Sequence, residues 1–276
     1  FILGTDPDSD RVGIMVRDKD GTYKTVTGNQ TGVLLLDYLM GAMARTGRLP
    51  EKPVALKTIV TTEMARAVAE AHGAACYDTF TGFKFLAEKK DKLEAAGEGK
   101  VVFSYEESYG YMLGDFVRDK DAVTASLLLT EMAAYYAGKG MTVLEALQAL
   151  YEKYGWYGEK TFNLVMPGLD GLADMARLMK SLREAPPAQI AGVDVVQFKD
   201  YLDGSVVDLA TGGKTAMELS GSNVLRFELA DGTSIIVRPS GTEPKIKVYI
   251  LTKGADAAER DANIAKYGAW VDTLKK

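Results

Sequence analysis

The sequence predicts an α/β protein, with a βαβ domain built on a mainly parallel sheet followed by a smaller α+β domain with an antiparallel sheet. In the first part, short segments rich in β-branched residues alternate with helical segments of about ten or more residues, which is the pattern of βαβ units. In the last third, predicted strands follow one another with turn residues between them. The 276 residues, 47% of them hydrophobic, suffice for two compact domains.

The first part of the chain opens with short strands. Residues 1–3 are interpreted as the end of a buried strand, and Asp20-Gly21 predicts a hairpin turn within residues 17–24. A helix then opens at residues 28–31, with a cap expected at Thr31. The later elements are predicted as strands at 54–61, 74–79 and 100–105, and as helices at 63–72, 83–94, 122–137 and 142–153.

The boundary between the two domains is placed at residues 151–158, where glycines and aromatic residues break the pattern. Asp231-Gly232 predicts a hairpin between two of the strands that follow, and Pro186-Pro187 ends the first helix. The elements expected here are strands at 160–166, 193–201, 223–229, 233–237 and 245–252, and helices at 169–182 and 255–274.

The composition excludes several classes of protein. A net charge of −5 and a pI of about 5.2 argue against a general nucleic-acid surface, which would need a basic face. No apolar run approaches the roughly 20 residues of a membrane-spanning helix, and no secretory leader is visible. The lone Cys76 excludes an internal disulfide and favours a reducing compartment. We therefore expect a soluble, cytoplasmic protein that binds neither nucleic acid nor a membrane.

The segment Asp6-Pro7-Asp8-Ser9-Asp10-Arg11 is the most informative part of the chain. Its alternating carboxylates are ligands that suit Mg²⁺, and Mn²⁺ or Zn²⁺ are alternatives under some conditions. Its arginine adds a planar fork that can hold a phosphate through two parallel hydrogen bonds. A calcium EF-hand loop is excluded because arginines occupy the positions of its glycine and glutamate. A solvated acidic turn remains the alternative to a magnesium site.

Three later segments follow predicted strands and carry polar groups. Thr81-Gly82-Phe83-Lys84 combines a glycine, a hydroxyl and a cation at a helix start, which favours an anion site or simple capping by Thr81. Glu106-Glu107-Ser108-Tyr109-Gly110 can hydrogen-bond vicinal sugar hydroxyls, with an exposed polar turn as the alternative. Arg118-Asp119-Lys120-Asp121 offers a lysine beside acidic residues, a pattern also typical of solvated faces and helix caps.

The segment from Arg238 to Lys245 has the groups that a phosphate monoester needs. Its glycine allows backbone N–H groups to turn inward, and hydroxyls and cations flank it. Ordinary hairpin turn chemistry is the alternative interpretation.

These five segments, in this order and spread over nearly the whole chain, resemble the α-D-phosphohexomutase family, the phosphoglucomutases and phosphomannomutases. The Glu-Glu-Ser-Tyr-Gly form is closer to the phosphoglucomutase branch, including its phosphopentomutase-like members. The resemblance implies interconversion of a sugar 1-phosphate and a sugar 6-phosphate, with glucose as the expected sugar. It also implies Mg²⁺, a phosphoserine and glucose 1,6-bisphosphate as the intermediate. Phosphomannomutase and phosphopentomutase specificity remain alternatives.

The resemblance implies domains and residue roles as well. Residues 1–25 would be the tail of a second domain, 26–154 a sugar-binding third domain and 155–276 a phosphate-binding fourth domain. Arg11 would face the phosphoryl group in transit, and Lys120 the reacting oxygens. The magnesium ligands would be Asp6, Asp8 and Asp10. The sugar would be held by Thr81, Gly82, Phe83, Lys84, Glu106 and Ser108, and the phosphate that is not transferred by Arg238, Ser240, Gly241 and Thr242.

One departure from the family pattern limits what we expect of this chain alone. The family's phosphoserine lies in a Ser-His-Asn-Pro loop of the first domain, and no such loop occurs here. The only histidine, His72, is expected at a helix end, and Ser126 on a helix. Because the chain begins with Phe1 inside an apparent strand, we expect it to be the downstream part of a longer protein, with the missing upstream domains as its partners.

We therefore predict no mutase turnover by this chain by itself. A sugar-phosphate-binding module without catalysis is the alternative from another class. A metal-dependent phosphatase with an aspartyl nucleophile fits less well, because Asp10 stands where its loop usually has threonine.

Overall fold

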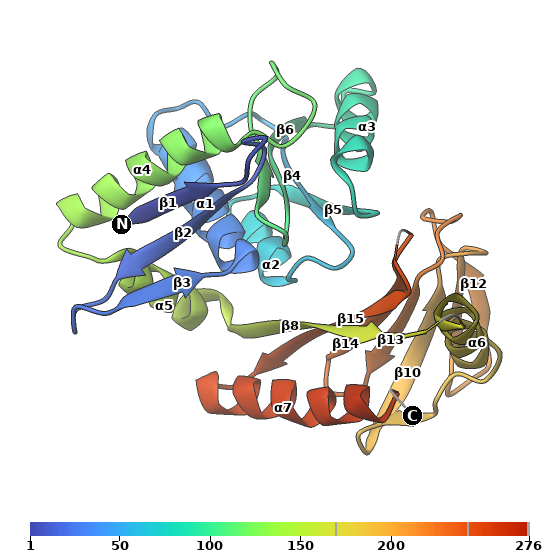
Figure 1. Cartoon of the computed structure of the whole chain (residues 1–276). Helices are drawn as coiled ribbons and strands as arrows, with labels where there is room; N and C mark the ends of the chain where they lie inside the picture. The colour runs from blue at the N-terminus through green and yellow to red at the C-terminus, as the bar shows by residue number, and fades with distance from the viewer. Residues whose placement is uncertain (169, 242, 275–276) are drawn as a thin grey trace. The chain divides into compact units, whose positions relative to one another are not determined.

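The computed structural model describes residues 1–168, 170–241 and 243–274. They form two compact units, Phe1–Gly155 and Trp156–Lys276 (Figure 1). The mixed α/β class is confirmed, with a sheet that contains parallel strands in the first unit and an antiparallel sheet in the second. No helix in the described ranges is long and apolar enough to cross a membrane.

A small antiparallel sheet opens the first unit, with strands β1 (Ile2–Thr5), β2 (Val12–Arg17) and β3 (Tyr23–Val26). Arg17 pairs with Tyr23 across the Asp20-Gly21 turn, so the predicted hairpin is confirmed. The prediction that the first strand is buried is wrong, since Ile2 is 48% exposed. The reason is that β1 is an edge strand, paired with β2 alone in the described part of the chain.

The main sheet of the first unit has the order β5-β4-β6-β7. Strands β4 (Pro53–Thr58), β5 (Ala75–Thr79) and β6 (Lys100–Glu106) are parallel, as predicted, and the short β7 (Gly110–Met112) is antiparallel to β6. All of β4 is buried, as expected for the central strand of such a sheet. The helices of this unit are α1 (Gly28–Arg45), α2 (Met64–Ala71), α3 (Phe83–Ala95), α4 (Ala122–Gly138) and α5 (Val143–Tyr154).

Helices cover both faces of this sheet. Helix α3 packs its leucines against Val54 and Leu56 on one face. Successive strand residues point to opposite faces, so Lys57 and its neighbour Tyr105 lie on the other face. Helix α1 approaches that second face closely, because a Cβ on Gly32 would lie 2.0 Å from the Tyr105 ring. The carboxyl ends of β4 and β6 therefore emerge between two helical layers.

The start of α1 differs from the prediction of a cap at Thr31. Thr27 is the N-cap: its Oγ1 accepts the N–H of Gln30 at 3.2 Å, and Gln30 Oε1 accepts the N–H of Thr27 at 2.9 Å. A cap needs an extended backbone just before the first helical turn, which Thr27 has. Thr31 is buried inside the helix instead.

In its described residues, the second unit has one antiparallel sheet and two helices (Figure 1). Its strand order is β12-β11-β10-β13-β14-β15-β8, with β9 beside β10. The Asp231-Gly232 hairpin joins β13 to β14, as predicted. The elements are β8 (Trp156–Val165), α6 (Gly171–Glu184), β9 (Gln189–Ile190), β10 (Val193–Asp200), β11 (Ser205–Asp208), β12 (Lys214–Ala216), β13 (Leu225–Leu229), β14 (Ser234–Pro239), β15 (Lys245–Gly254) and α7 (Ala257–Thr273).

The core of this unit lies between the sheet and its helices. Met179 and Leu182 of α6 and Tyr267 and Val271 of α7 pack with apolar side chains of the sheet, Phe227 among them. Strands β9, β11 and β12 were not predicted from the sequence, and they are among the shortest strands of the unit.

Candidate functional site

The 6–11 loop between β1 and β2 brings its carboxylates together. Asp6 Oδ1 accepts the N–H groups of Asp10 at 3.1 Å and Arg11 at 3.0 Å, and Ser9 takes the left-handed conformation with φ of 56°. As a result, Asp6, Asp8 and Asp10 each offer one oxygen within 4.8 Å of the others. The Arg11 N–H is the main cause that lowers the pKa of the Asp6 carboxyl, which is therefore ionised at neutral pH.

The donor set of this loop fits a hard divalent cation. Asp10 Oδ1 is buried and accepts no hydrogen bond from the described residues, whereas Oδ2 lies 2.6 Å from Lys120 Nζ. A buried carboxylate oxygen without a donor is costly, and an oxygen-seeking cation would satisfy it. The three carboxylates outnumber the neighbouring cations, since Arg11 and Lys120 are the cations paired with them. The residues present therefore fit Mg²⁺.

Lys120 is held in a defined place beside this loop. Burial pushes the pKa of Lys120 down, but its bonds to Asp10 and Asp119 outweigh this and raise the pKa above its usual value. The ammonium lies 5.7 Å from the centre of the Phe83 ring, and Phe83 itself is buried. A Cβ added to Gly110 would come within 2.7 Å of Phe83 Cε2 and 3.0 Å of Lys120 Cδ. Only glycine at position 110 allows this approach.

The 106–110 turn, which joins β6 to β7, is bonded to the 6–11 loop through the backbone. Val12 N–H donates to Tyr109 O at 3.1 Å, and Arg11 forms an isolated bridge with Gly110. Tyr109 has a φ of 68°, a strained conformation for a residue with a side chain. Helix α4 joins the same cluster, since Ala122 N–H donates to Ser9 O at 3.1 Å.

The predicted segment at residues 81–84 contacts this cluster through the Phe83 ring beside Lys120, and also through a hydrogen bond from Gly82 N–H to the Glu106 carboxylate. Gly82 is the N-cap of α3 and has a φ of 117°, so Thr81 does not have the capping role considered as an alternative. Lys84 is exposed, with its ammonium 4.7 Å from the Phe85 ring centre. Glu106 is buried and Ser108 is partly buried. Four of the five predicted segments thus lie together in the first unit.

The fifth segment lies in the second unit, at the turn between β14 and β15. Arg238 is on β14, and Ser240 N–H donates to Lys245 O at 2.8 Å. Gly241 is exposed, and a Cβ there would meet nothing within 4 Å, so the turn leaves open space at this residue. Thr242, which was also predicted to hold phosphate, lies outside the described residues.

Lys247, which was not predicted from the sequence, is a further candidate residue beside this segment. It pairs directly with Arg238 across the two strands, so two cations share one face of the sheet. Like charges directly opposite each other are unfavourable unless an anion lies between or beside them. The available signal was the alternation of Lys245 and Lys247 along one strand, which places both on the same face. Lys245 itself pairs with Glu243, and this bond lowers the pKa of the Glu243 carboxyl.

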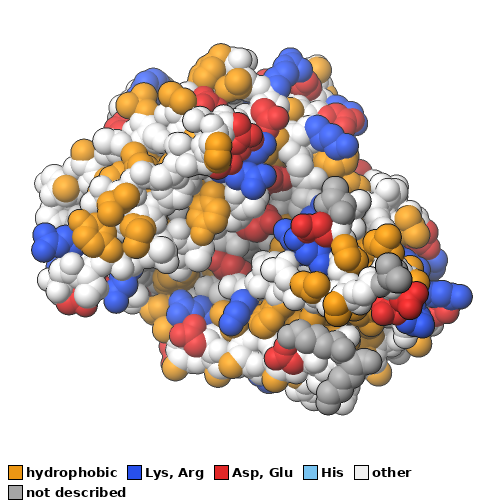
Figure 2. Space-filling model, viewed as in Figure 1, with side chains coloured by type: hydrophobic (Ala, Val, Ile, Leu, Met, Phe, Trp, Pro, Cys, Tyr) orange, Lys and Arg blue, Asp and Glu red, His pale blue; other side chains and the backbone are white. Residues whose placement is uncertain are grey.

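Other polar residues have structural positions. His72 ends α2 and its Nε2 lies 3.0 Å from Asp37 Oδ1, and Ser126 is inside α4, both as predicted. On the face shown in Figure 2, acidic and basic side chains are intermixed, in line with the net charge of −5.

Comparison with known proteins identifies the family. The model of the phosphoglucomutase/phosphomannomutase alpha/beta/alpha domain III matches residues 27–154, and that of the C-terminal domain matches residues 175–263. The chain is 35% identical over 256 residues to a phosphoglucomutase of Staphylococcus aureus (strain N315). This alignment covers 93% of the chain and 45% of the relative, so the chain spans about half the length of the curated relatives it matches.

Solved structures share the fold. The phosphoglucomutase parafusin from Paramecium, in its open form, superposes with a TM-score of 0.65 at 21% identity, over 99% of this chain and 45% of that one. Two structures of Aspergillus fumigatus N-acetylphosphoglucosamine mutase give TM-scores of 0.51 and 0.52 at 14% and 13% identity, over 99% of this chain and 48% and 49% of theirs. With its motifs, its fold and its matches to domain III and the C-terminal domain, the chain belongs to the phosphoglucomutase/phosphomannomutase family of α-D-phosphohexomutases.

Proposed function

We propose that this chain supplies the sugar-binding and phosphate-binding parts of a phosphoglucomutase-type enzyme, which interconverts a sugar 1-phosphate and a sugar 6-phosphate. Its 35% identity to a phosphoglucomutase supports glucose as the sugar. The observation that carries the proposal is the cluster of three carboxylates within 4.8 Å of one another, with Lys120 2.6 Å from Asp10. The lone, buried Cys76 supports a reducing compartment, and we place the enzyme in the cytoplasm.

Residues 1–25 would be the tail of a second domain, 26–154 the third domain and 155–276 the fourth. The matches of family models to residues 27–154 and 175–263 support the last two assignments. The antiparallel β1-β2-β3 sheet precedes the first of these matches, which supports the assignment of the first residues to a different domain.

In the first unit, Asp6, Asp8 and Asp10 would hold Mg²⁺. When bound, the ion withdraws charge from the phosphoryl group that is transferred. Arg11 lies next to these ligands with its side chain 49% exposed, so its guanidinium can reach a phosphate oxygen. Lys120 keeps its proton and would stabilise the reacting oxygens as charge moves between them. A solved structure of the Aspergillus enzyme contains magnesium, and another contains glucose 1,6-bisphosphate, which supports both as ligands here.

Glu106 and Ser108, with residues 81–84, would hydrogen-bond the sugar hydroxyls. Arg238, Ser240, Gly241 and Thr242, helped by Lys247, would hold the phosphate that is not transferred. The bisphosphate intermediate must turn around between two transfers, so each phosphate-binding site has to accept either end of the sugar. Cations and backbone N–H groups suit this task because they recognise the phosphate and not the sugar attached to it.

The phosphoserine that exchanges phosphate with the sugar would come from a Ser-His-Asn-Pro loop outside these 276 residues, since the chain contains one histidine and it is not in such a loop. The chain by itself would then bind the intermediate but not turn over. Its partners would be the upstream domains of the same protein.

Calorimetric titration with glucose 1,6-bisphosphate in the presence of Mg²⁺ tests the proposal. We expect saturable binding that is lost in Arg238→Ala and kept in Arg177→Ala, whose side chain is exposed on α6 and pairs with Asp174. A version extended upstream to include the serine loop should interconvert glucose 1-phosphate and 6-phosphate, and the short chain should not.

Three outcomes would contradict the proposal. Turnover by the short chain would show that no upstream serine is needed. Release of inorganic phosphate from a sugar phosphate by the short chain would favour an aspartyl phosphatase. Saturable binding without turnover in the extended protein would favour a sugar-phosphate-binding module.

A further inference from the structure

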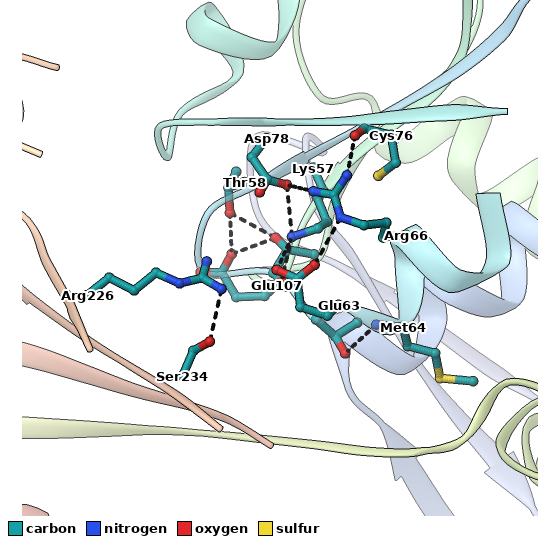
Figure 3. A network of polar contacts seen from close by, with 12 residues as sticks. Lys57, Thr58, Glu63, Met64, Arg66, Cys76, Asp78, Glu107, Arg226 and Ser234 are labelled. Atoms are coloured by element: carbon teal, nitrogen blue, oxygen red, sulfur yellow. Dashed lines mark hydrogen bonds and ion pairs between the residues drawn. The ribbon is translucent and has the colours of Figure 1, made fainter. Parts of the chain in front are cut away.

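Glu107 lies between Glu106 and Ser108 in sequence, but its side chain is engaged with another loop. Its Oε2 lies 3.4 Å from Thr58 Oγ1 and 3.5 Å from Thr61 Oγ1. The two threonine hydroxyls are 2.8 Å apart, and both threonines are fully buried. One hydroxyl hydrogen joins the two threonines, which leaves the other to donate to the carboxylate. Figure 3 shows Thr58 beside Glu107 in this arrangement.

A charge cluster around the buried Lys57 holds the threonine loop in place. Lys57 is fully buried, and its Nζ contacts Thr61 O at 3.2 Å, Glu63 Oε1 at 3.0 Å and Asp78 Oδ1 at 3.0 Å. Arg66 binds the same two carboxylates, at 3.3 Å from Glu63 and 3.0 Å from Asp78 (Figure 3). Two cations and two anions balance, so the cluster carries no net charge. Because one Lys57 donor bonds the Thr61 carbonyl, the cluster fixes the backbone of the loop between β4 and α2.

The start of α1 confines the same turn from another direction. A Cβ on Gly28 would lie 2.0 Å from Glu107 O and 2.9 Å from Tyr109 N, so the helix touches the backbone of the 106–110 turn. The next residue, Asn29, accepts the N–H of Thr62 at 3.0 Å and so joins the helix to the threonine loop. The threonines therefore hold the 106–110 turn through the Glu107 side chain, and α1 holds it through the backbone.

We infer that Lys57, Thr58 and Thr61 are positioning residues, which anchor Glu107 and thereby aim Glu106 and Ser108 at the sugar. This inference rests on the proposed function for the identity of the ligand. Glu106 and Ser108 share peptide units with Glu107, so a fixed Glu107 carboxylate restricts the orientation of both neighbours. A turn that already carries strain at Tyr109, with φ of 68°, needs such external contacts to keep one conformation. Glu107 would thus serve the site without touching the sugar.

Hydrogen exchange of the whole chain, measured by mass spectrometry, tests the positioning role without any ligand. Thr61→Val keeps the shape of the side chain and removes its hydroxyl, and Thr61→Ser restores the hydroxyl. We expect roughly tenfold faster exchange in peptides that cover residues 79–86 and 103–112 for the valine variant, and near-normal exchange for the serine variant. Thr130→Val is the matched control, since Thr130 is an exposed threonine of α4 that bonds Ser126 O at 2.8 Å.

Calorimetry with glucose 1,6-bisphosphate separates this inference from the proposed function. Weaker binding by Thr61→Val, about tenfold, with recovery in Thr61→Ser supports both. A second outcome is that Thr61→Val exchanges faster but the unaltered chain binds no bisphosphate. This outcome supports the positioning role and counts only against the proposed function. Because Thr58 can still donate to Glu107 when Thr61 is replaced, the decisive variant is Thr58→Val with Thr61→Val, and unchanged exchange in this double variant overturns the positioning role, whatever the binding. Loss of binding in Glu107→Gln with normal exchange also overturns it, because Glu107 would then contact the sugar directly.

Discussion

Replacement of Gly110 by alanine should both destabilise the first unit and displace Phe83 and Lys120 in the candidate site. The added Cβ would lie 2.7 Å from Phe83 Cε2 and 3.0 Å from Lys120 Cδ, both closer than ordinary contact. Phe83 is buried and cannot swing into solvent, and Lys120 is tied to Asp10 at 2.6 Å. Overpacking of this kind costs about 1–3 kcal/mol.

A second effect works in the opposite direction. Gly110 does not have a positive φ, so alanine adds no backbone strain there. Alanine also reduces the freedom of the unfolded chain, which offsets up to about 1 kcal/mol. The expected net loss in the free energy of unfolding is therefore about 0–3 kcal/mol, and the middle of the two ranges gives about 1.5 kcal/mol.

Urea denaturation followed by two signals tests this prediction. Both tryptophans, Trp156 and Trp270, belong to the second unit, so their fluorescence reports that unit, whereas far-UV circular dichroism reports both. We expect Gly110→Ala to lower the midpoint by circular dichroism and to leave the fluorescence midpoint in place. Gly138→Ala is the control, because a Cβ at this last residue of α4 meets nothing within 4 Å and alanine favours a helix. A Gly110→Ala variant as stable as Gly138→Ala would refute the packing argument.

Three further outcomes follow from the structure. Thr27→Ala should lower the free energy of unfolding by about 1 kcal/mol, because it removes the capping box of α1, and equal stability in urea would contradict that cap. Bonds to Lys100 and Lys90 lower the pKa of Asp115 from 3.8 to about 2, so its stabilising effect is present above pH 3.8 and is lost as the pH falls towards 2. Since the Asp115 side chain is 60% exposed, Asp115→Asn should lower the free energy of unfolding by under about 1 kcal/mol at neutral pH. A loss of stability that is unchanged in 1 M NaCl would argue against an ionic origin. Burial raises the pKa of the Cys76 thiol to about 11, so iodoacetamide should label it at neutral pH only after unfolding, and rapid labelling of the folded chain would contradict this burial.

Local signals in the sequence predicted most elements correctly. The hairpins at Asp20-Gly21 and Asp231-Gly232 form where turn chemistry placed them, because such turns depend on a few adjacent residues. The short strands β7, β11 and β12 were missed, since strands of three or four residues carry little periodicity. The helix cap was assigned to Thr31 and not to Thr27 because both threonines precede apolar residues, and only the backbone conformation separates them.

By itself, the sequence determined the family and the fold class, and it named the segments that we propose carry the chemistry, because spacing within a loop is local information. Tertiary structure alone decided how the four segments of the first unit meet. Lys120 reaches Asp10 because the Arg11–Gly110 bridge joins two loops that are far apart in the chain. Lys247 joins Arg238 through strand register, and Glu107 turns to Thr58 and Thr61 through the packing of neighbouring loops. Such contacts depend on how strands pair and helices pack, which no short stretch of residues encodes.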